Sequence, residues 1–383
     1  MNRPFDRSVV ALDIGSSGVR AAEFTVGRRP RLEKFAAMPL PTGAVNAGVV
    51  VDPSAVGKAL KQLWSSAKFT SKQVVFSIAN DRVLVRQLDL DWMEPSDFRK
   101  ALVYSVADAI PMSLDDTNLD YHILEELSAV PELGIDRTLR VLIVAAGRDM
   151  VETFVTALDE AGLSPLKADL APFALIRAVC PSAVNVAADT AEAIVDIGAD
   201  TLTVAAHSGG RPRFVRTISH LGGRFITGEL QQKFGWSFDQ AEQAKANFGL
   251  PRQRTGLIPA PAAPHGAASN GTGSTPATSV GSVAEHSAQQ AIAERATAVV
   301  GEVRTTLNFF LSAGTGVTKL SRVVLTGGGS LLSGLDERIS EALGVPVEAL
   351  APPENVRFSR AVPKDPVGSA SVALLSGLAL GAE

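Results

Sequence analysis

A strand–turn–strand pattern with an acid near its tip occurs twice in this sequence. Residues 9–24 read VVALDIGSSGVRAAEF, and residues 191–206 read AEAIVDIGADTLTVAA. In both segments β-branched residues favour strands, and a glycine (Gly15 or Gly198) permits the tight turn of a hairpin. The repetition predicts two similar lobes, each with this hairpin at its head, that face each other across a cleft.

Length and charge narrow the class of protein. A chain of 383 residues is long enough for two or three domains. Its net charge is −4 and its 36 basic residues are scattered, so we expect no nucleic-acid partner. The single Cys180 excludes an intramolecular disulfide, and the polar start lacks the apolar core of a signal peptide. These features predict a cytoplasmic protein.

The most apolar stretch, SVALLSGLALGA at residues 371–382, is shorter than the roughly 20 residues of a transmembrane helix. It also lacks the flanking Lys and Arg of a helix that lies on a membrane surface. We therefore expect a buried terminal helix and no direct membrane anchor.

Strand and helix signals alternate between the two hairpins. Strand-like runs occupy residues 73–80, 82–90 and 137–147. Helical spacing marks residues 95–110, which begin at a proline, and the segment after Arg148 that closes at Gly162. This mixture predicts an α/β or α+β fold. Residues 251–287 contain no aromatic residue and are rich in Pro, Ala, Gly, Ser and Thr, so we expect a disordered insertion.

Two further glycine clusters lie in the second half, HLGGRFITGEL at residues 220–230 and VVLTGGGSLLSGL at residues 323–335. Glycines between a strand and a helix let the backbone approach a ligand that a Cβ would obstruct. A single cluster of this kind is typical of an ordinary turn. The ordered set of two hairpins and two clusters points to a binding site.

These motifs resemble those of the actin-like ATPases, and within them the PilM family of type IV pilus assembly, which is related to FtsA. DIGSSGVR resembles the first phosphate motif, VDIGADT the second, and LTGGGSLLSGL the adenosine motif. The AE-x-x-K pattern at residues 241–245 is similar to the ribose-contacting helix. The resemblance implies an actin-like (ribonuclease H-like) two-lobed α/β fold with a nucleotide cleft and a small FtsA/PilM-type subdomain.

The resemblance also implies domain limits. They are residues 1–83 for the core of the first lobe, completed by 167–190; 84–166 for an inserted α+β subdomain; and 191–383 for the second lobe, with 216–317 as its outer subdomain and 251–287 as the insertion.

By resemblance, the ligands are ATP and Mg²⁺. Asp13 and Asp196 would hold Mg²⁺ through water, and backbone N–H groups with the hydroxyls of Ser16 and Ser17 would bind phosphates. The alternative is that both aspartates only cap turns. The implied nucleotide-binding set is Gly15, Ser16, Ser17, Gly198, Ala199, Gly222, Gly223, Glu242, Lys245, Gly327, Gly328, Gly329 and Ser330.

Two helices carry further expectations. Glu242 and Lys245 lie three residues apart, on one helix face, where they would contact ribose and adenine or form a solvated ion pair. Residues 168–178 resemble the helix that joins the lobes, but Ala171 replaces the acid that relatives often carry before Pro172. Without a carboxylate to orient water, ATP hydrolysis is expected to be slow or absent. Asp169 is the remaining catalytic candidate, and a helix cap is its alternative role.

No other catalytic set is evident, since the five histidines show no metal-ligand spacing and Cys180 reads as a buried bystander. The implied function is that of a cytoplasmic ATP-binding adaptor, recruited to the inner face of the membrane by the tail of a PilN-like protein. Residues 84–166 would receive that tail. An apolar stripe at Phe98, Ala101, Leu102 and Val106 would lie beside the groove or simply form core.

Two other functions stay open at this point. An FtsA-like division adaptor would carry a C-terminal linker and an amphipathic membrane helix, which we do not find. A small-molecule kinase would need a positioned general base and a substrate pocket. Self-association also remains open.

Overall fold

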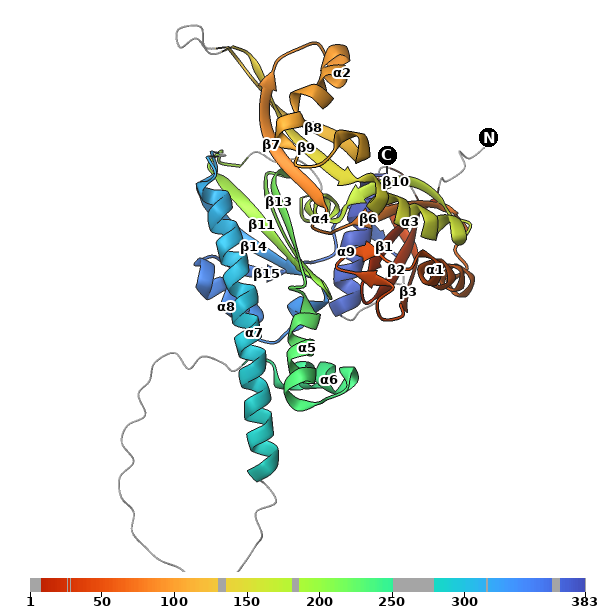
Figure 1. Ribbon diagram of the computed structural model, residues 1–383, viewed down its shortest axis with the longest axis vertical. Coiled ribbons are helices and arrows are strands. Elements are labelled where there is room, and N and C mark those ends of the chain that lie inside the picture. The colour runs from red at the N-terminus through yellow and green to blue at the C-terminus, as the bar shows by residue number, and fades with distance from the viewer. Residues whose placement is uncertain are drawn as a thin grey trace, which may run out of the picture.

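The structure, a computed structural model, describes residues 8–25, 27, 29–129, 136–180, 186–250, 279–314, 316–359 and 366–382. Two lobes, each built on one main β-sheet, stand side by side, and a smaller three-stranded sheet lies at one end of the molecule (Figure 1). The mixture of strands and helices confirms the predicted α/β class.

The first lobe is built on a six-stranded sheet with the order β10-β6-β1-β2-β3-β16. The strands are β1 (Ser8–Gly15), β2 (Gly18–Thr25), β3 (Arg31–Pro39), β6 (Gln73–Ile78), β10 (Ser164–Leu170) and β16 (Arg357–Phe358). Alternate residues of β1 enter different cores because side chains alternate across a strand. Val10 and Leu12 pack with α1 (Pro53–Ala67) and α3 (Arg148–Glu160), whereas Val9 and Ala11 pack with α4 (Ala171–Val179) and α9 (Pro366–Leu380).

The second lobe repeats this plan with a five-stranded sheet of the order β13-β12-β11-β14-β15. The strands are β11 (Thr190–Ile197), β12 (Thr201–Ser208), β13 (Arg211–Ser219), β14 (Lys319–Thr326) and β15 (Val347–Ala349). The hairpin β11–β12 is antiparallel and β14 runs parallel to β11, as β1–β2 and β6 do in the first lobe. The predicted duplication is therefore confirmed. One face of this sheet is covered by α5 (Gly223–Phe234), α6 (Phe238–Phe248), α7 (Ser279–Ser312) and α8 (Leu335–Leu343).

The small subdomain consists of an antiparallel sheet of the order β7-β9-β8 and the helix α2 (Pro95–Ser105). Its strands are β7 (Val83–Asp91), β8 (Thr117–Leu127) and β9 (Thr138–Gly147). Two short 3-10 turns (Ala107–Ala109, Leu114–Asp116) connect α2 to β8. A separate two-stranded pair, β4 (Val45–Asn46) and β5 (Val49–Val50), lies in the first lobe. Phe98, Leu102 and Val106 are buried against this sheet, and the Phe98 ring lies 5.0 Å from that of Tyr121. The apolar stripe of α2 therefore forms part of the subdomain's hydrophobic core, which was one of the two alternatives predicted for it.

The predicted domain limits are wrong in three places. First, α3 and β10 belong to the first lobe and not to the inserted subdomain, because Phe154 stacks on Phe76 of β6 and β10 pairs with β6. Second, β16 and α9 pack on the first lobe, although the second lobe was expected to extend to residue 383. Third, α7 begins at Ser279, so the end of the predicted insertion is helical.

The third correction has a local cause. Residues 284–296 are rich in Ala, Gln and Glu, which are strong helix formers, and the buried Ala288 and Ala291 anchor this part of α7. The rest of the predicted insertion, residues 251–278, lies outside the described residues.

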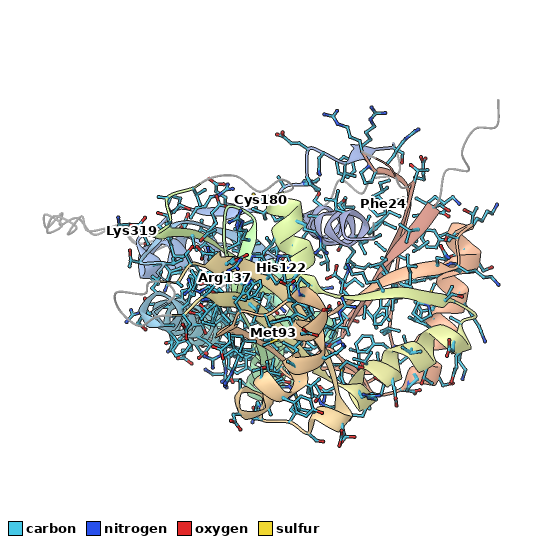
Figure 2. All side chains as sticks on the ribbon, turned by 90° about the horizontal axis from the view of Figure 1, so that it is seen from above. Phe24, Met93, His122, Arg137, Cys180 and Lys319 are labelled. Atoms are coloured by element: carbon cyan, nitrogen blue, oxygen red, sulfur yellow. The ribbon has the colours of Figure 1, made fainter. Side chains whose placement is uncertain are left out.

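The apolar C-terminal stretch forms most of α9. Val372, Leu375 and Leu378 are fully buried between α4 and the first sheet, as predicted for a buried terminal helix. Among the residues that the structure describes, no helix combines the length and apolar character that a membrane crossing requires. Figure 2 shows Cys180 at the end of α4. This cysteine is half-buried, whereas a buried one was predicted.

Candidate functional site

A cavity of about 410 Å³ lies between the two lobes. Both hairpins reach it, together with α5, α6 and the glycine turn after β14. It brings together these predicted site residues: Asp13, Gly15, Ser16, Ser17, Asp196, Gly198, Ala199, Gly223, Glu242, Lys245, Gly327, Gly328 and Gly329. Gly222, Ser330 and Asp169 do not line it.

The first hairpin is held by polar contacts around Asp13. Its Oδ1 accepts a hydrogen bond from Ser77 Oγ at 2.8 Å, and its Oδ2 accepts one from Arg20 Nη1 at 3.2 Å. Arg20 Nη2 also donates to Ser17 Oγ at 3.0 Å. Sequence reasoning missed Arg20 and Ser77. The antiparallel register pairs Asp13 with Arg20, so the two-residue turn of the motif was a signal that could have found Arg20.

The second hairpin presents Asp196, the counterpart of Asp13. Burial and the negative charge of Asp13 raise the pKa of Asp196 to about 7, and Arg20 opposes this effect. The glycine turn packs directly on this carboxylate, because a Cβ on Gly327 would lie 2.4 Å from Asp196 Oδ1. Gly327 also has a φ of +85°, which favours glycine. The turn after β14 thus requires glycine for both backbone conformation and space.

Gly222 and Ser330 do not line the cavity, but they support the turns that do. A Cβ on Gly222 would lie 2.4 Å from the carbonyl oxygen of Ala199, so glycine allows α5 to start directly against the second hairpin. Ser330 Oγ donates to the carbonyl oxygen of Gly327 at 2.6 Å and thereby stabilises the glycine turn.

The pair Glu242 and Lys245 is more than a solvated ion pair. Lys245 Nζ donates to Glu242 Oε1 at 2.7 Å, to Thr227 Oγ1 at 2.7 Å and to the carbonyl oxygen of Gly223 at 3.1 Å. These bonds join α6 to the first turn of α5. One turn earlier on α6, the ring of Phe238 lines the same cavity and is 45% exposed.

An arginine that sequence reasoning missed lies between the two hairpins. Arg224, at the start of α5, contacts Asp200 in the second hairpin turn and the carbonyl oxygen of Ser16 in the first. Arg224 and Asp200 both line the cavity.

The catalytic candidate Asp169 is not presented to the cavity. It lies at the end of β10, is 8% exposed and forms an ion pair with Arg177 of α4. Ala171 does line the cavity. The start of α4 therefore brings a methyl group, and not a carboxylate, to this wall.

The carboxylate oxygens of Asp13 and Asp196 suit a hard divalent cation. Within the described ranges, no three His, Cys, Asp or Glu side chains come together as a metal site. Two facing carboxylates whose charges disfavour each other fit Mg²⁺, which keeps several of its waters and takes few protein ligands.

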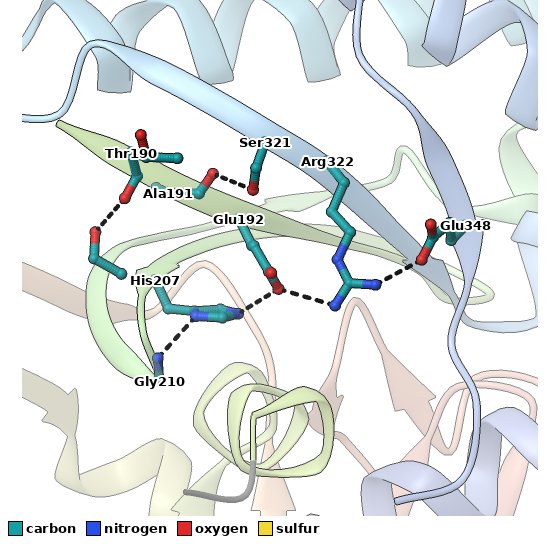
Figure 3. Close-up of polar contacts among 9 residues, drawn as sticks. Thr190, Ala191, Glu192, His207, Gly210, Ser321, Arg322 and Glu348 are labelled. Atoms are coloured by element: carbon teal, nitrogen blue, oxygen red, sulfur yellow. Dashed lines mark hydrogen bonds and ion pairs between the residues drawn. The ribbon is translucent and has the colours of Figure 1, made fainter. Parts of the chain in front are cut away.

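A second polar cluster lies in the same lobe, at the opposite end of β11 from Asp196. His207 Nδ1 accepts a hydrogen bond from the Gly210 N–H at 3.1 Å, and Nε2 lies 3.5 Å from Glu192, which also contacts Arg322 (Figure 3). Burial lowers the pKa of His207; Glu192 opposes this effect and Arg322 adds to it. The ring is 1% exposed, so this network fixes the sheet and offers no open site.

Comparisons with known proteins agree with this geometry. The sequence profile described as type IV pilus assembly protein PilM matches residues 11–265, and that of cell division protein FtsA matches residues 193–373. The cell division protein FtsA of Neisseria meningitidis serogroup B is 25% identical over 390 aligned positions, which cover 96% of this chain and 89% of that protein.

Solved structures match over nearly the whole chain. A PilM–PilN type IV pilus biogenesis complex matches with a TM-score of 0.76 and 24% identity, covering 98% of both chains. The ethanolamine utilization protein EutJ from Carboxydothermus hydrogenoformans matches with a TM-score of 0.53 and 15% identity, covering 99% of this chain and 90% of that one. The predicted actin-like fold is thus confirmed. The PilM profile also spans most of the length of this chain, and the chain therefore belongs to the family of the type IV pilus assembly protein PilM.

Proposed function

We propose that this chain is an adaptor of type IV pilus assembly that binds ATP with Mg²⁺ in its cleft. The observation that carries this proposal is the convergence of the two hairpins, with Asp13 and Asp196, on one cavity. Ser16, Ser17 and the glycine turn would contact phosphates and base, while the two aspartates hold the waters of Mg²⁺. Magnesium would supply charge neutralisation for the phosphates.

Hydrolysis is expected to be weak, because Asp196 is the proposed holder of the Mg²⁺ waters and the other acids that could orient water already have partners. Asp13 is bound by Arg20 and Ser77, Glu242 by Lys245, and Asp169 by Arg177 outside the cavity. A general base must lie within hydrogen-bond reach of the proton that it accepts. We therefore propose nucleotide binding, and not turnover, as the output of this cleft.

The test measures retained nucleotide and released phosphate with labelled ATP and Mg²⁺. Asp13→Ala should weaken nucleotide affinity at least about tenfold, since it removes one holder of the Mg²⁺ waters and a charge-assisted hydrogen-bond acceptor. Asp52→Ala is the control, because that carboxylate caps α1 and does not line the cavity. Equal calorimetric affinity for wild type and Asp13→Ala would refute the site, and rapid phosphate release would refute the adaptor reading.

The proposed partner is the cytoplasmic tail of a PilN-like inner-membrane protein, which would recruit the chain to the inner face of the membrane. The small subdomain supports this role because apolar side chains remain exposed on it: Tyr104 is 83% exposed, Val103 41% and Ile123 44%. A short peptide can bind such a surface by strand addition or by filling pockets.

Binding of an immobilised PilN-type tail peptide tests this partner. Val103→Asp should weaken binding at least about tenfold, because it places a charge on the proposed contact surface. The matched control is Val51→Asp, which changes an exposed valine of the first lobe. Equal loss in both variants would remove the subdomain from the interface, and no binding by wild type would refute the partner.

A further inference from the structure

We propose that Arg224 is a positioning residue that fixes the separation of the two hairpins across the cleft before nucleotide binds. This inference rests on the proposed function, since the cavity between the hairpins is the proposed nucleotide site.

The backbone of Arg224 is tied to the second hairpin. The Arg224 N–H donates to the carbonyl oxygen of Ala199 at 2.8 Å, and the Gly223 N–H donates to that of Gly198 at 2.9 Å. The Arg224 guanidinium also donates from Nη1 to Asp200 Oδ2 at 3.2 Å. Arg224 therefore moves with the second lobe, and its orientation is set by the turn on which it lies.

The other arm of the guanidinium crosses to the first lobe. Arg224 Nη2 donates to the carbonyl oxygen of Ser16 at 2.9 Å, between residues 208 positions apart in the sequence. Ser16 forms the turn of the first hairpin and is 6% exposed. One planar side chain thus joins the two hairpin turns, both of which line the cavity.

The surroundings favour arginine over lysine at this position. A guanidinium donates from two nitrogens in a fixed fork, whereas a lysine ammonium is a single point of charge. The Arg224 side chain is 26% exposed and that of Asp200 11%, so water screens this pair only in part. The guanidinium carbon also lies 5.9 Å from the centre of the Phe238 ring, which attracts a cation.

The bond between Arg224 and Ser16 should affect the binding and release of nucleotide more than its hydrolysis. If the hairpins are already held at one separation, a nucleotide does not have to bring the lobes together. Its release, in contrast, requires the lobes to part, and the bond between Arg224 and Ser16 opposes that movement. Loss of a part-buried, charge-assisted hydrogen bond of this kind should speed nucleotide release about tenfold.

The experiment compares lobe separation in nucleotide-free protein by electron–electron double resonance. Spin labels are placed through Gln62→Cys in α1 and Gln232→Cys in α5, both exposed, in a Cys180→Ser background. Arg224→Lys and Arg224→Gln should broaden the distance distribution and shift it to longer values. The matched control is Arg295→Gln, because Arg295 pairs with Glu229 inside the second lobe and does not cross the cleft.

Stopped-flow release of a fluorescent ATP analogue provides the second readout. An unchanged distance distribution in both Arg224 variants overturns the proposal, and faster release with that unchanged distribution would make Arg224 a direct phosphate contact instead. If wild type binds no nucleotide, the proposed function fails, while the distance measurement still decides the role of Arg224. A broadened distribution with release about tenfold faster supports it.

Discussion

Replacing Gly377 by alanine should destabilise the protein by forcing two central helices apart. Gly377 lies in α9, where a Cβ would stand 1.9 Å from the carbonyl oxygen of Ala174 and 2.5 Å from its carbonyl carbon, both in α4. Non-bonded heavy atoms pack at about 3.5 Å, so the helices would have to separate by more than about 1 Å. The surrounding core, including Leu375 and Leu378, is fully buried and cannot absorb such a shift.

The magnitude follows from two opposing terms. Overpacking of a core costs about 1–3 kcal/mol or more, and backbone atoms of a helix yield less than a side chain does. Replacing glycine by alanine inside a helix returns about 1 kcal/mol. Because the clash is with backbone atoms, we take a cost of about 3 kcal/mol, and we expect Gly377→Ala to lower the free energy of unfolding by about 2 kcal/mol.

Urea unfolding followed by circular dichroism measures this change. Gly228→Ala is the matched control, since Gly228 is an exposed glycine of α5 whose added Cβ would meet nothing within 4 Å. The control should gain about 0.5–1 kcal/mol. If Gly377→Ala is as stable as wild type or more stable, α4 and α9 do not pack at the described separation.

Two further predictions concern pH. Burial and Asp13 raise the pKa of Asp196 to about 7, so its ionisation disfavours the folded, metal-free chain as the pH rises from about 4 to 7. Asp196→Asn should then raise the unfolding free energy at pH 8, measured in a chelator, by about 2 kcal/mol. This is less than the full pKa shift implies, because water in the cavity screens the charges. A lower melting temperature would contradict this prediction. Burial alone would raise the pKa of Glu23, but hydrogen bonds from Thr70, Lys34 and Ser71 hold it below 4.5. Glu23→Gln should cost about 2 kcal/mol at pH 7 and less as the pH falls through the native pKa of this carboxyl, where wild type loses the same contribution; parallel pH–stability curves would contradict it.

Local patterns were sufficient to predict the elements that carry the site. The two hairpins, the helix α6 and the glycine turn each depend on residues close together in the sequence, and the structure brings them to one cavity. Arg224 could not be found in this way, because its partner Ser16 lies 208 positions away and nothing in either segment indicates the other.

The errors in the domain limits have the same origin. An amphipathic pattern such as that of α3 predicts that one face is buried, but it does not say which sheet will cover it. The packing of α3 in the first-lobe core, with Phe154 stacked on Phe76, assigns this helix to the first lobe. The stripe on α2 was open to two readings for the same reason, and the contact between Phe98 and Tyr121 decides it.

The position of α9 has a consequence for how the chain acquires its structure during synthesis. Val9 and Ala11 of β1 share one core with Val372, Leu375 and Leu378, and β16 completes the edge of the first sheet beside β3. A ribosome makes β1 first and α9 more than 300 residues later. The part of this face of the N-terminal sheet that α9 covers must therefore stay open until nearly the whole chain has emerged, and such long-range contacts form slowly. In the cell, this apolar face is the surface on which we expect a nascent-chain chaperone to act.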